Sequence, residues 1–342
     1  MPNLWNQKYD RDLLHALTST ISSVAGLRPF SYDDGRVRNM RGIDGWTGGG
    51  LRFTLWPDRA LDIGPVWFNE KPVSWLHPGM GAPQFYDPNG LGWLRTFGGG
   101  LLTTCGLVHI GAPDDYQGKS FGLHGRVSHL PAENVRIWQE WQGEDYVLIV
   151  EGEVRQTVLF GEHLLLKRRI ETSLGSRQLI VKDAVSNESS QATPHSLLYH
   201  CNIGFPILSP SSELRIEDDR VEPRSAAAAA GLADHTRFDE PIPGYEEQVF
   251  FHHPKVDLEG FAQASLFNPD LNLGIQVRWH AATMPVMTEW KMIGAGEYVC
   301  GLEPTTHALA PWEELAEKGL PRTLQPGETV KYELQLSIID NY

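Results

Sequence analysis

The stretch DYVLIVEGEVRQTVLFGEHLLLKRRIETSLGSRQLIVKDAVSNES, residues 145–189, decides the fold class. Apolar runs of strand length are separated by turn residues, first at Gly161-Glu162 and again at residues 174–177. Three or four strands therefore follow one another within about 45 residues. Connections this short join antiparallel neighbours, because parallel strands need crossovers of about a dozen residues or more. The stretch predicts an antiparallel sheet at the centre of the chain.

Similar patterns extend over the rest of the sequence. Further strands are expected in LRFTLWPDRALDIG, residues 51–64, and at residues 271–279, 298–302 and 329–339. Short helices are predicted at Ser225–Gly231, where five alanines run together, and in PWEELAEKG, residues 311–319. The sequence contains no internal repeat and no linker rich enough to divide it. We therefore expect an all-β fold, one large antiparallel β-sandwich with short helical decorations.

The N-terminal region has a different period. Asp10 can cap a helix in which apolar residues recur at helical spacing. These residues are Leu13, Leu14, Leu17, Ile21 and Val24. From about residue 36 the strand pattern takes over. The sequence therefore predicts a helical extension, residues 1–35, followed by a single β-sandwich domain, residues 36–342.

Composition excludes several partners. The 342 residues include 29 Lys and Arg against 43 Asp and Glu, a net charge of −14. Nucleic acids and anionic membranes both need a basic surface, so neither is an expected partner. The first residues contain acids and no long apolar run, so we expect no signal peptide and no membrane span. The three cysteines lie far apart, which is typical of free thiols in the reducing cytoplasm.

One C-terminal stretch, EYVCGLEPTTH from Glu297 to His307, ends an apolar run with an acid. Because Pro304 cannot donate to a sheet ladder, the strand is expected to finish there, with Glu303 at the rim of the sheet. A glutamate in that position is usually just solvated. If the rim borders a sugar cleft, Glu303 is a candidate general base.

Two histidines stand in unusual surroundings. In FGLHGRVSHLPA, residues 121–132, glycines near His124 allow another group to approach the backbone closely. In LLYHCNIGFP, residues 197–206, His200 ends an apolar run on the same strand face as Leu198. Either histidine could simply satisfy a nearby carbonyl. The alternative is a role in catalysis or ligand binding.

Two further stretches offer polar groups for a ligand. Arg59 lies in a turn between apolar runs and is either a surface arginine or a fork of donors for ligand hydroxyls. In MPVMTEWKMIG, residues 284–294, Trp290 and Lys291 follow Glu289. This segment is either a charged loop with one packed Trp or a stacking platform with polar flanks.

Three of these motifs carry a resemblance to a known family. The chain resembles the galactose mutarotase-like superfamily, the aldose 1-epimerases, and is most similar to a little-characterised bacterial branch. The matching pieces are LHGRVS, LLYHCNIGFP and VCGLEPTTH, which occur in the family's order and at comparable spacing. The resemblance covers roughly residues 40 to 340 and implies the family's large β-sandwich, the supersandwich.

The resemblance also implies roles for individual residues. His200 corresponds to the general acid, Glu303 to the general base, and His124 to a second histidine that holds a sugar hydroxyl. Arg59 corresponds to a binding arginine, although its flanking residues differ. The resemblance implies no metal or other cofactor.

The family's middle-strand acid has no direct counterpart in GYEEQVFFHH, residues 244–253. Glu246 or Glu247 stands in its place, with Glu247 taken as the substrate-binding residue beside Trp290 and Lys291. This departure suggests a sugar other than galactose. The expected ligand remains a small sugar.

Mutarotation needs a base for the anomeric hydroxyl and an acid for the ring oxygen. We expect an ionised Glu303 and a protonated His200 on opposite walls of one hollow. A separation of roughly 5–9 Å, as in glycosidase carboxylate pairs, would leave room for the sugar. Two other functions stay open. One is a metal-dependent sugar isomerase or lyase that uses His124, His200 and Glu303 as ligands. The other is a carbohydrate-binding sandwich without turnover.

Overall fold

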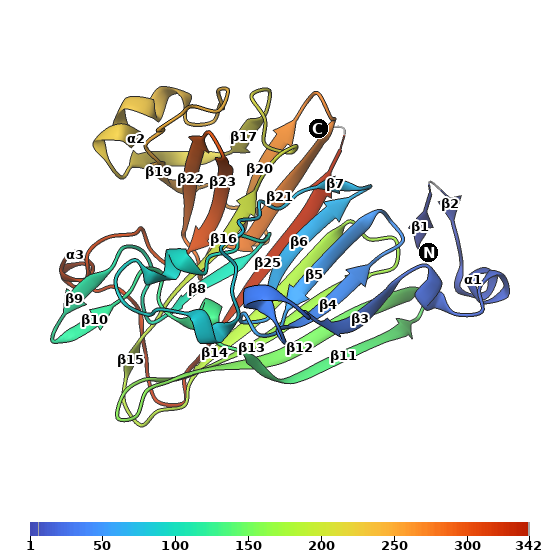
Figure 1. Ribbon diagram of the computed structural model, residues 1–342, viewed down its shortest axis with the longest axis horizontal. Helices are drawn as coiled ribbons and strands as arrows, with labels where there is room; N and C mark the ends of the chain where they lie inside the picture. Colours follow the sequence, from blue (N-terminus) through green and yellow to red (C-terminus); the bar gives the residue numbers. More distant parts are fainter. Residues whose placement is uncertain (6, 341–342) are drawn as a thin grey trace.

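The computed structural model describes residues 1–5 and 7–340, which form three large antiparallel sheets (Figure 1). The largest sheet has eight strands. Their order is β11 (Ala132–Gln142), β12 (Asp145–Thr157), β13 (His163–Ser173), β14 (Gln178–Asn187), β25 (Thr329–Ile339), β21 (Leu273–His280), β20 (Phe261–Asn268) and β17 (Glu213–Ile216). The central stretch supplies β12, β13 and β14, which pair antiparallel across the two predicted turns. The predicted antiparallel β-sandwich is therefore confirmed.

The two other large sheets pack against this one. The six-stranded sheet has the order β18 (Asp218–Pro223), β19 (Gln248–Pro254), β22 (Val286–Gly294), β23 (Glu297–Thr305), β16 (Ser196–Ile203) and β8 (Thr103–Leu107). The five-stranded sheet has the order β3 (Gly26–Ser31), β4 (Arg41–Trp46), β5 (Leu51–Trp56), β6 (Asp62–Phe68) and β7 (Lys71–Pro72). Buried side chains from all three sheets form one continuous core, with Ile63, Val150 and Leu197 among its members.

Small elements decorate the sandwich. Three separate two-stranded sheets also occur among the described residues: β1 (Asn3–Leu4) with β2 (Gln7–Lys8), β9 (Asp114–Tyr116) with β10 (Lys119–Phe121), and β15 (Thr193–Pro194) with β24 (Thr323–Leu324). The helices are α1 (Arg11–Leu17), α2 (Ala226–Gly231) and α3 (Trp312–Glu317). Both α2 and α3 fall where short helices were predicted. Within the described part of the chain, no helix has the length and apolar character needed to cross a membrane.

The N-terminal segment differs from its prediction. The Asp10 side chain caps α1 as expected, accepting a 2.7 Å hydrogen bond from the Leu13 N–H. However, α1 ends at Leu17, and β3 pairs with β4 in the five-stranded sheet. Residues 1–35 are therefore not only a helical extension, because their last part is a strand of the sandwich.

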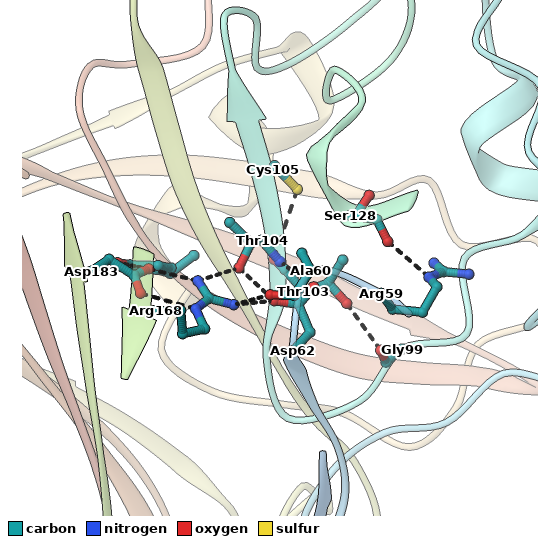
Figure 2. A network of polar contacts seen from close by, with 11 residues as sticks. Arg59, Ala60, Asp62, Gly99, Thr103, Thr104, Cys105, Ser128, Arg168 and Asp183 are labelled. Carbon is teal, nitrogen blue, oxygen red and sulfur yellow. Dashed lines mark hydrogen bonds and ion pairs between the residues drawn. The ribbon is translucent and has the colours of Figure 1, made fainter. Parts of the chain in front are cut away.

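A buried ionic network ties the three sheets together (Figure 2). Arg168 of β13 contacts Asp62 of β6 and Asp183 of β14, each at 2.6 Å. Its Nη2 also donates to the Thr104 hydroxyl on β8 at 2.8 Å. The Tyr199 hydroxyl of β16 donates to Asp183 at 2.7 Å. Because these five residues come from all three sheets, the network fixes the position of the strand that carries His200.

Candidate active site

His200 and Glu303 are neighbours on adjacent strands. The register of β16 and β23 pairs Leu198 with Thr305 and Cys201 with Leu302, which places His200 opposite Glu303. The His200 Nε2 and Glu303 Oε1 atoms are 3.1 Å apart. The two groups therefore lie side by side on one wall of the cleft, and the expected separation across a sugar ring is wrong.

Pro304 has a different effect from the one predicted. The strand does not stop at this residue, since β23 runs on to Thr305 and Pro304 pairs with Met287 of β22. On the other side, the ladder to β16 has no pairs at Glu303 and Pro304. Pro304 has no N–H to contribute to this ladder. The interruption falls beside the contact between His200 and Glu303.

Both members of this pair are buried and incompletely hydrogen-bonded. The side chain of His200 is 6% exposed and that of Glu303 is 3% exposed. His200 Nδ1 and Glu303 Oε1 have no hydrogen-bond partner in the described residues, so the 3.1 Å approach is a contact without hydrogen-bond geometry. Buried polar atoms of this kind are rare in folded proteins. They are available to a ligand.

Burial sets the protonation of the pair. It raises the pKa of Glu303 well above its ordinary value; the Glu247 charge adds to this rise and the Arg224 charge opposes it. Burial also lowers the pKa of His200 to about 3, and the Asn202 side chain opposes this shift. Both shifts favour a neutral imidazole beside a protonated carboxyl group. The free protein therefore disfavours the expected pairing of ionised Glu303 with protonated His200.

The pair faces an aromatic-walled cleft of ≈ 640 Å³. Trp290 lies edge-on to His200 with ring centroids 5.3 Å apart, and Phe97 lies at 5.4 Å. Trp93 stacks on Phe97 at 4.3 Å, and Trp75 also lines the cleft. Flat apolar walls with a few polar groups are typical of sites for small ligands.

His124 lies in the same cleft on a strained turn. Its φ angle of 56° is in the left-handed region, which is uncommon for a residue with a side chain. Its Nδ1 accepts a long, 3.4 Å hydrogen bond from the Gly111 N–H. Burial, assisted by the neighbouring His200, holds the pKa of His124 well below its ordinary value. A neutral ring whose Nδ1 is an acceptor carries its proton on Nε2 and can donate it to a hydroxyl.

Trp290 and Glu247 form a second polar contact in the cleft. Trp290 Nε1 donates to Glu247 Oε2 at 2.8 Å, and both residues line the cleft. Glu246 does not line it, so of the two candidate glutamates only Glu247 lies in the cleft.

Two predicted binding residues do not belong to this cleft. Lys291 follows Trp290 on β22 and points to the opposite face of the strand, where its Nζ donates to the main-chain oxygens of Asp234 and Arg237. Arg59 is 4% exposed, and its guanidinium donates to main-chain oxygens, including that of Ser128 at 2.8 Å (Figure 2). Both side chains are held by backbone carbonyls, so their expected substrate-binding roles are not supported.

The cleft also contains residues that sequence reasoning missed. Arg224 lines it, is exposed, and has no side-chain hydrogen bond or ion pair among the described residues. Thr288 lies opposite Glu303 on β22, and its buried hydroxyl has no hydrogen-bond partner in the part of the chain described. Arg224 belongs to no recognisable motif, and Thr288 was not singled out within the stretch 284–294; only the folded chain brings them beside Glu303.

The predicted metal ligands do not form a metal-binding group. Among the described residues, the group of His, Cys, Asp or Glu side chains close enough to share an ion is His235, His252 and Glu289. None of these three lines the cleft. The alternative that relied on His124, His200 and Glu303 as ligands is therefore not supported by the geometry.

Several solved structures share this fold. A Klebsiella pneumoniae protein provisionally described as an aldose 1-epimerase matches with a TM-score of 0.87 and 23% identity, over 92% of this chain and 83% of its own. A galactose mutarotase-like protein from Clostridium acetobutylicum matches with a TM-score of 0.63 and 14% identity, over 92% and 99%. The galactose 1-epimerase of Lactobacillus acidophilus matches with a TM-score of 0.58 and 12% identity, over 93% of this chain and 100% of its own. The chain thus has the fold of these galactose mutarotase-like and aldose 1-epimerase-like proteins.

The particular family follows from the sequence match. Residues 38–338 match the family described as "Domain of unknown function (DUF4432)", and the chain belongs to this family. No curated protein matches the chain.

Proposed function

We propose that the protein is an aldose 1-epimerase-like isomerase that interconverts the anomers of a sugar by general acid–base catalysis. The observation that carries the proposal is the contact between His200 and Glu303. Two buried proton carriers lie 3.1 Å apart, each has an unpartnered polar atom, and both face an aromatic cleft. Incompletely paired groups with strongly shifted pKa values in a cleft are typical of catalytic sites.

The side-by-side arrangement suits the reaction. The anomeric hydroxyl and the ring oxygen are both bonded to C1, so they are adjacent atoms of the sugar. An acid and a base in contact on one wall can therefore reach both oxygens at once. Glu303 as carboxylate takes the hydroxyl proton and protonated His200 gives a proton to the ring oxygen. The C1–O5 bond breaks as the C1 carbonyl forms, rotation about C1–C2 follows, and reversal closes the ring on the other face.

Each ring opening moves one proton between the two groups through the substrate. It starts from carboxylate and imidazolium and leaves carboxyl and neutral imidazole, which is the arrangement that burial favours. The two arrangements hold the same number of protons, so no exchange with solvent is needed. The Arg224 charge acts against burial and favours the ionised Glu303 that begins the cycle.

The remaining cleft residues would bind the sugar. Trp290 and Trp93 present ring faces and edges suited to the C–H surfaces of a pyranose. His124 would donate from Nε2 to a hydroxyl, and the exposed Glu247 would accept from one. The class of sugar is determined by a direct assay of anomer interconversion.

Anomer-resolved NMR exchange spectroscopy over a panel of aldoses and ketoses tests the proposal. We expect Glu303→Gln and His200→Asn each to slow interconversion of the substrate by about 10²–10⁴-fold. Glu246→Gln and His253→Asn are matched controls outside the cleft and should keep the wild-type rate. Rates within a few-fold of wild type in both cleft variants would refute the assignment. Saturable binding without interconversion of any anomer would identify a binding protein instead.

A further inference from the structure

A second buried cluster lies behind the cleft wall. Strand β22 sends Thr288 and Trp290 into the cleft, whereas the residue between them, Glu289, points to the other face of the sheet. There the Glu289 Oε2 atom meets His235 Nδ1 at 2.9 Å and His252 Nε2 at 3.1 Å. The catalysis proposed above uses none of these three residues.

The three side chains come from separate segments. His252 lies on β19, which pairs directly with β22. His235 follows the short 3₁₀ helix Leu232–Asp234, in the segment after α2 that covers this face. Lys291 fixes the same segment by donating to the main-chain oxygens of Asp234 and Arg237. The backbone on both sides of His235 is therefore held in place.

The geometry points to a divalent metal site, and we propose that His235, His252 and Glu289 bind Zn²⁺ or a similar borderline metal ion. One ligand atom from each residue lies within 4.8 Å of the others. Ligands bonded to a tetrahedral zinc at about 2.0–2.2 Å stand roughly 3.3–3.6 Å from one another. The two contacts of Glu289 Oε2, at 2.9 and 3.1 Å, are only slightly shorter than this, so small side-chain rotations would admit the ion.

Two further observations favour a ligand here. Glu289 is fully buried, yet its Oε1 atom has no hydrogen-bond partner among the described residues, so the carboxylate keeps unused coordinating capacity. His252 Nδ1 contacts the Asp218 carboxylate at 2.9 Å. A carboxylate on the far nitrogen of a histidine is the usual outer partner of a metal ligand, because it fixes the ring and its tautomer. Two histidines and a carboxylate are also a common zinc ligand set.

The ion would have a structural role rather than a catalytic one. None of its ligands lines the cleft, so an ion there would not touch a sugar in the cleft. It would instead join β19 and β22 to the segment that carries His235. Because β22 also bears Trp290, the ion would stiffen the cleft wall from behind.

Titration of metal-stripped protein without a His-tag tests the site. ZnCl₂ in isothermal calorimetry should show one ion per chain, and Co²⁺ should give the intense visible absorption of a tetrahedral site. His235→Ala removes a direct ligand and should weaken Zn²⁺ binding by more than the roughly 10–100-fold that is typical for loss of an outer partner. Because His235 lies at the edge of the cluster, this variant should fold. His253→Ala is the control, since His253 is next to His252 and outside the cluster, and it should bind like wild type.

The results of the Zn²⁺-binding experiments can be told apart from those of the sugar-interconversion assay. Loss of binding in His235→Ala and Glu289→Gln but not in His253→Ala supports the site. Equal binding in His235→Ala and His253→Ala, or no Zn²⁺ binding to wild type, overturns it. Sugar interconversion by metal-free protein has no bearing on this result, so the two proposals fail independently.

Discussion

Strand β16 separates two buried groups of polar side chains that face opposite ways. Tyr199 points into the core and joins the network of Arg168, where both carboxylates are paired and the arginine has four side-chain and main-chain partners. His200, the next residue, points into the cleft and touches Glu303, where one atom of each side chain lacks a partner. The charges of Asp183 and Asp62 overcome burial and raise the pKa of Arg168, so that group stays ionised.

The difference teaches how one sheet serves two purposes. Buried charge in the core is fully satisfied and supports the fold. Buried polarity in the cleft is left partly unsatisfied, at a cost to the free energy of folding that a bound ligand can offset. Variants on the two sides of β16 should therefore change stability in opposite directions.

Breaking the core network should have the largest effect on stability. Arg168→Met leaves Asp62 and Asp183 buried without their cation, and we expect it to lower the free energy of unfolding by about 3–5 kcal/mol. Arg169→Met is the matched control, because this neighbouring arginine is 31% exposed and forms surface ion pairs. It should lower stability by less than about 1 kcal/mol. Urea denaturation measures both, and a similar small loss in each would show that the core network contributes little.

Neutralising Glu303 should raise the free energy of unfolding, whereas breaking the core network lowers it. The pKa of Glu303 in the folded protein is raised by burial, so stability is lost as the pH rises above the ordinary value of 4.5. Glu303→Gln cannot ionise and should be more stable than wild type at pH 8, by about 1–3 kcal/mol. The gain should vanish below pH 4.5, where the unfolded carboxyl is protonated as well. Urea denaturation at pH 4 and pH 8 gives both values, and a destabilised variant at pH 8 would contradict the prediction.

His200 should show the mirror-image dependence on pH. Its folded pKa of about 3 lies below the ordinary value of 6.5, so the unfolded state binds the extra proton between these values. Wild type should therefore lose stability relative to His200→Asn by about 1.4 kcal/mol per pH unit as the pH falls from 6 to 4. Urea denaturation of wild type and His200→Asn at each pH gives the difference in their free energies of unfolding. The surface carboxylates are common to both proteins, so this difference reports the titration of His200. A constant difference over that range would show that the histidine is not buried in neutral form.

The sequence predicted the sandwich well because each strand carries its own pattern. Alternating apolar residues and short polar turns are local signals, and β12 to β14 followed them. The contact between His200 and Glu303 depends on the pairing of β16 with β23, which lie about 100 residues apart, and no local pattern specifies that pairing. Two strand ends were expected to face each other across a hollow. The chain instead aligned them as partners in one sheet.

Other residues were misplaced for separate reasons. Arg59 lies in a predicted turn, but the Ser128 carbonyl that binds it belongs to the 3₁₀ helix Val127–His129, 69 residues further along the chain. Lys291 could have been excluded from the sequence, since it follows Trp290 on a strand and must face the other side.

The smallest expected effect sharpens the comparison within the cleft. Trp290→Phe keeps an aromatic wall but removes the 2.8 Å hydrogen bond to Glu247. Because Glu247 is exposed, its freed carboxylate finds water, and folding stability should change by less than about 0.5 kcal/mol. The substrate loses an oriented carboxylate, worth about 0.5–1.5 kcal/mol, so KM should rise about 2–10-fold while kcat stays within two-fold. Glu246→Gln, next to Glu247 but outside the cleft, should leave both parameters unchanged in the NMR exchange assay. A fall in kcat with unchanged KM would instead place Glu247 among the groups that move protons.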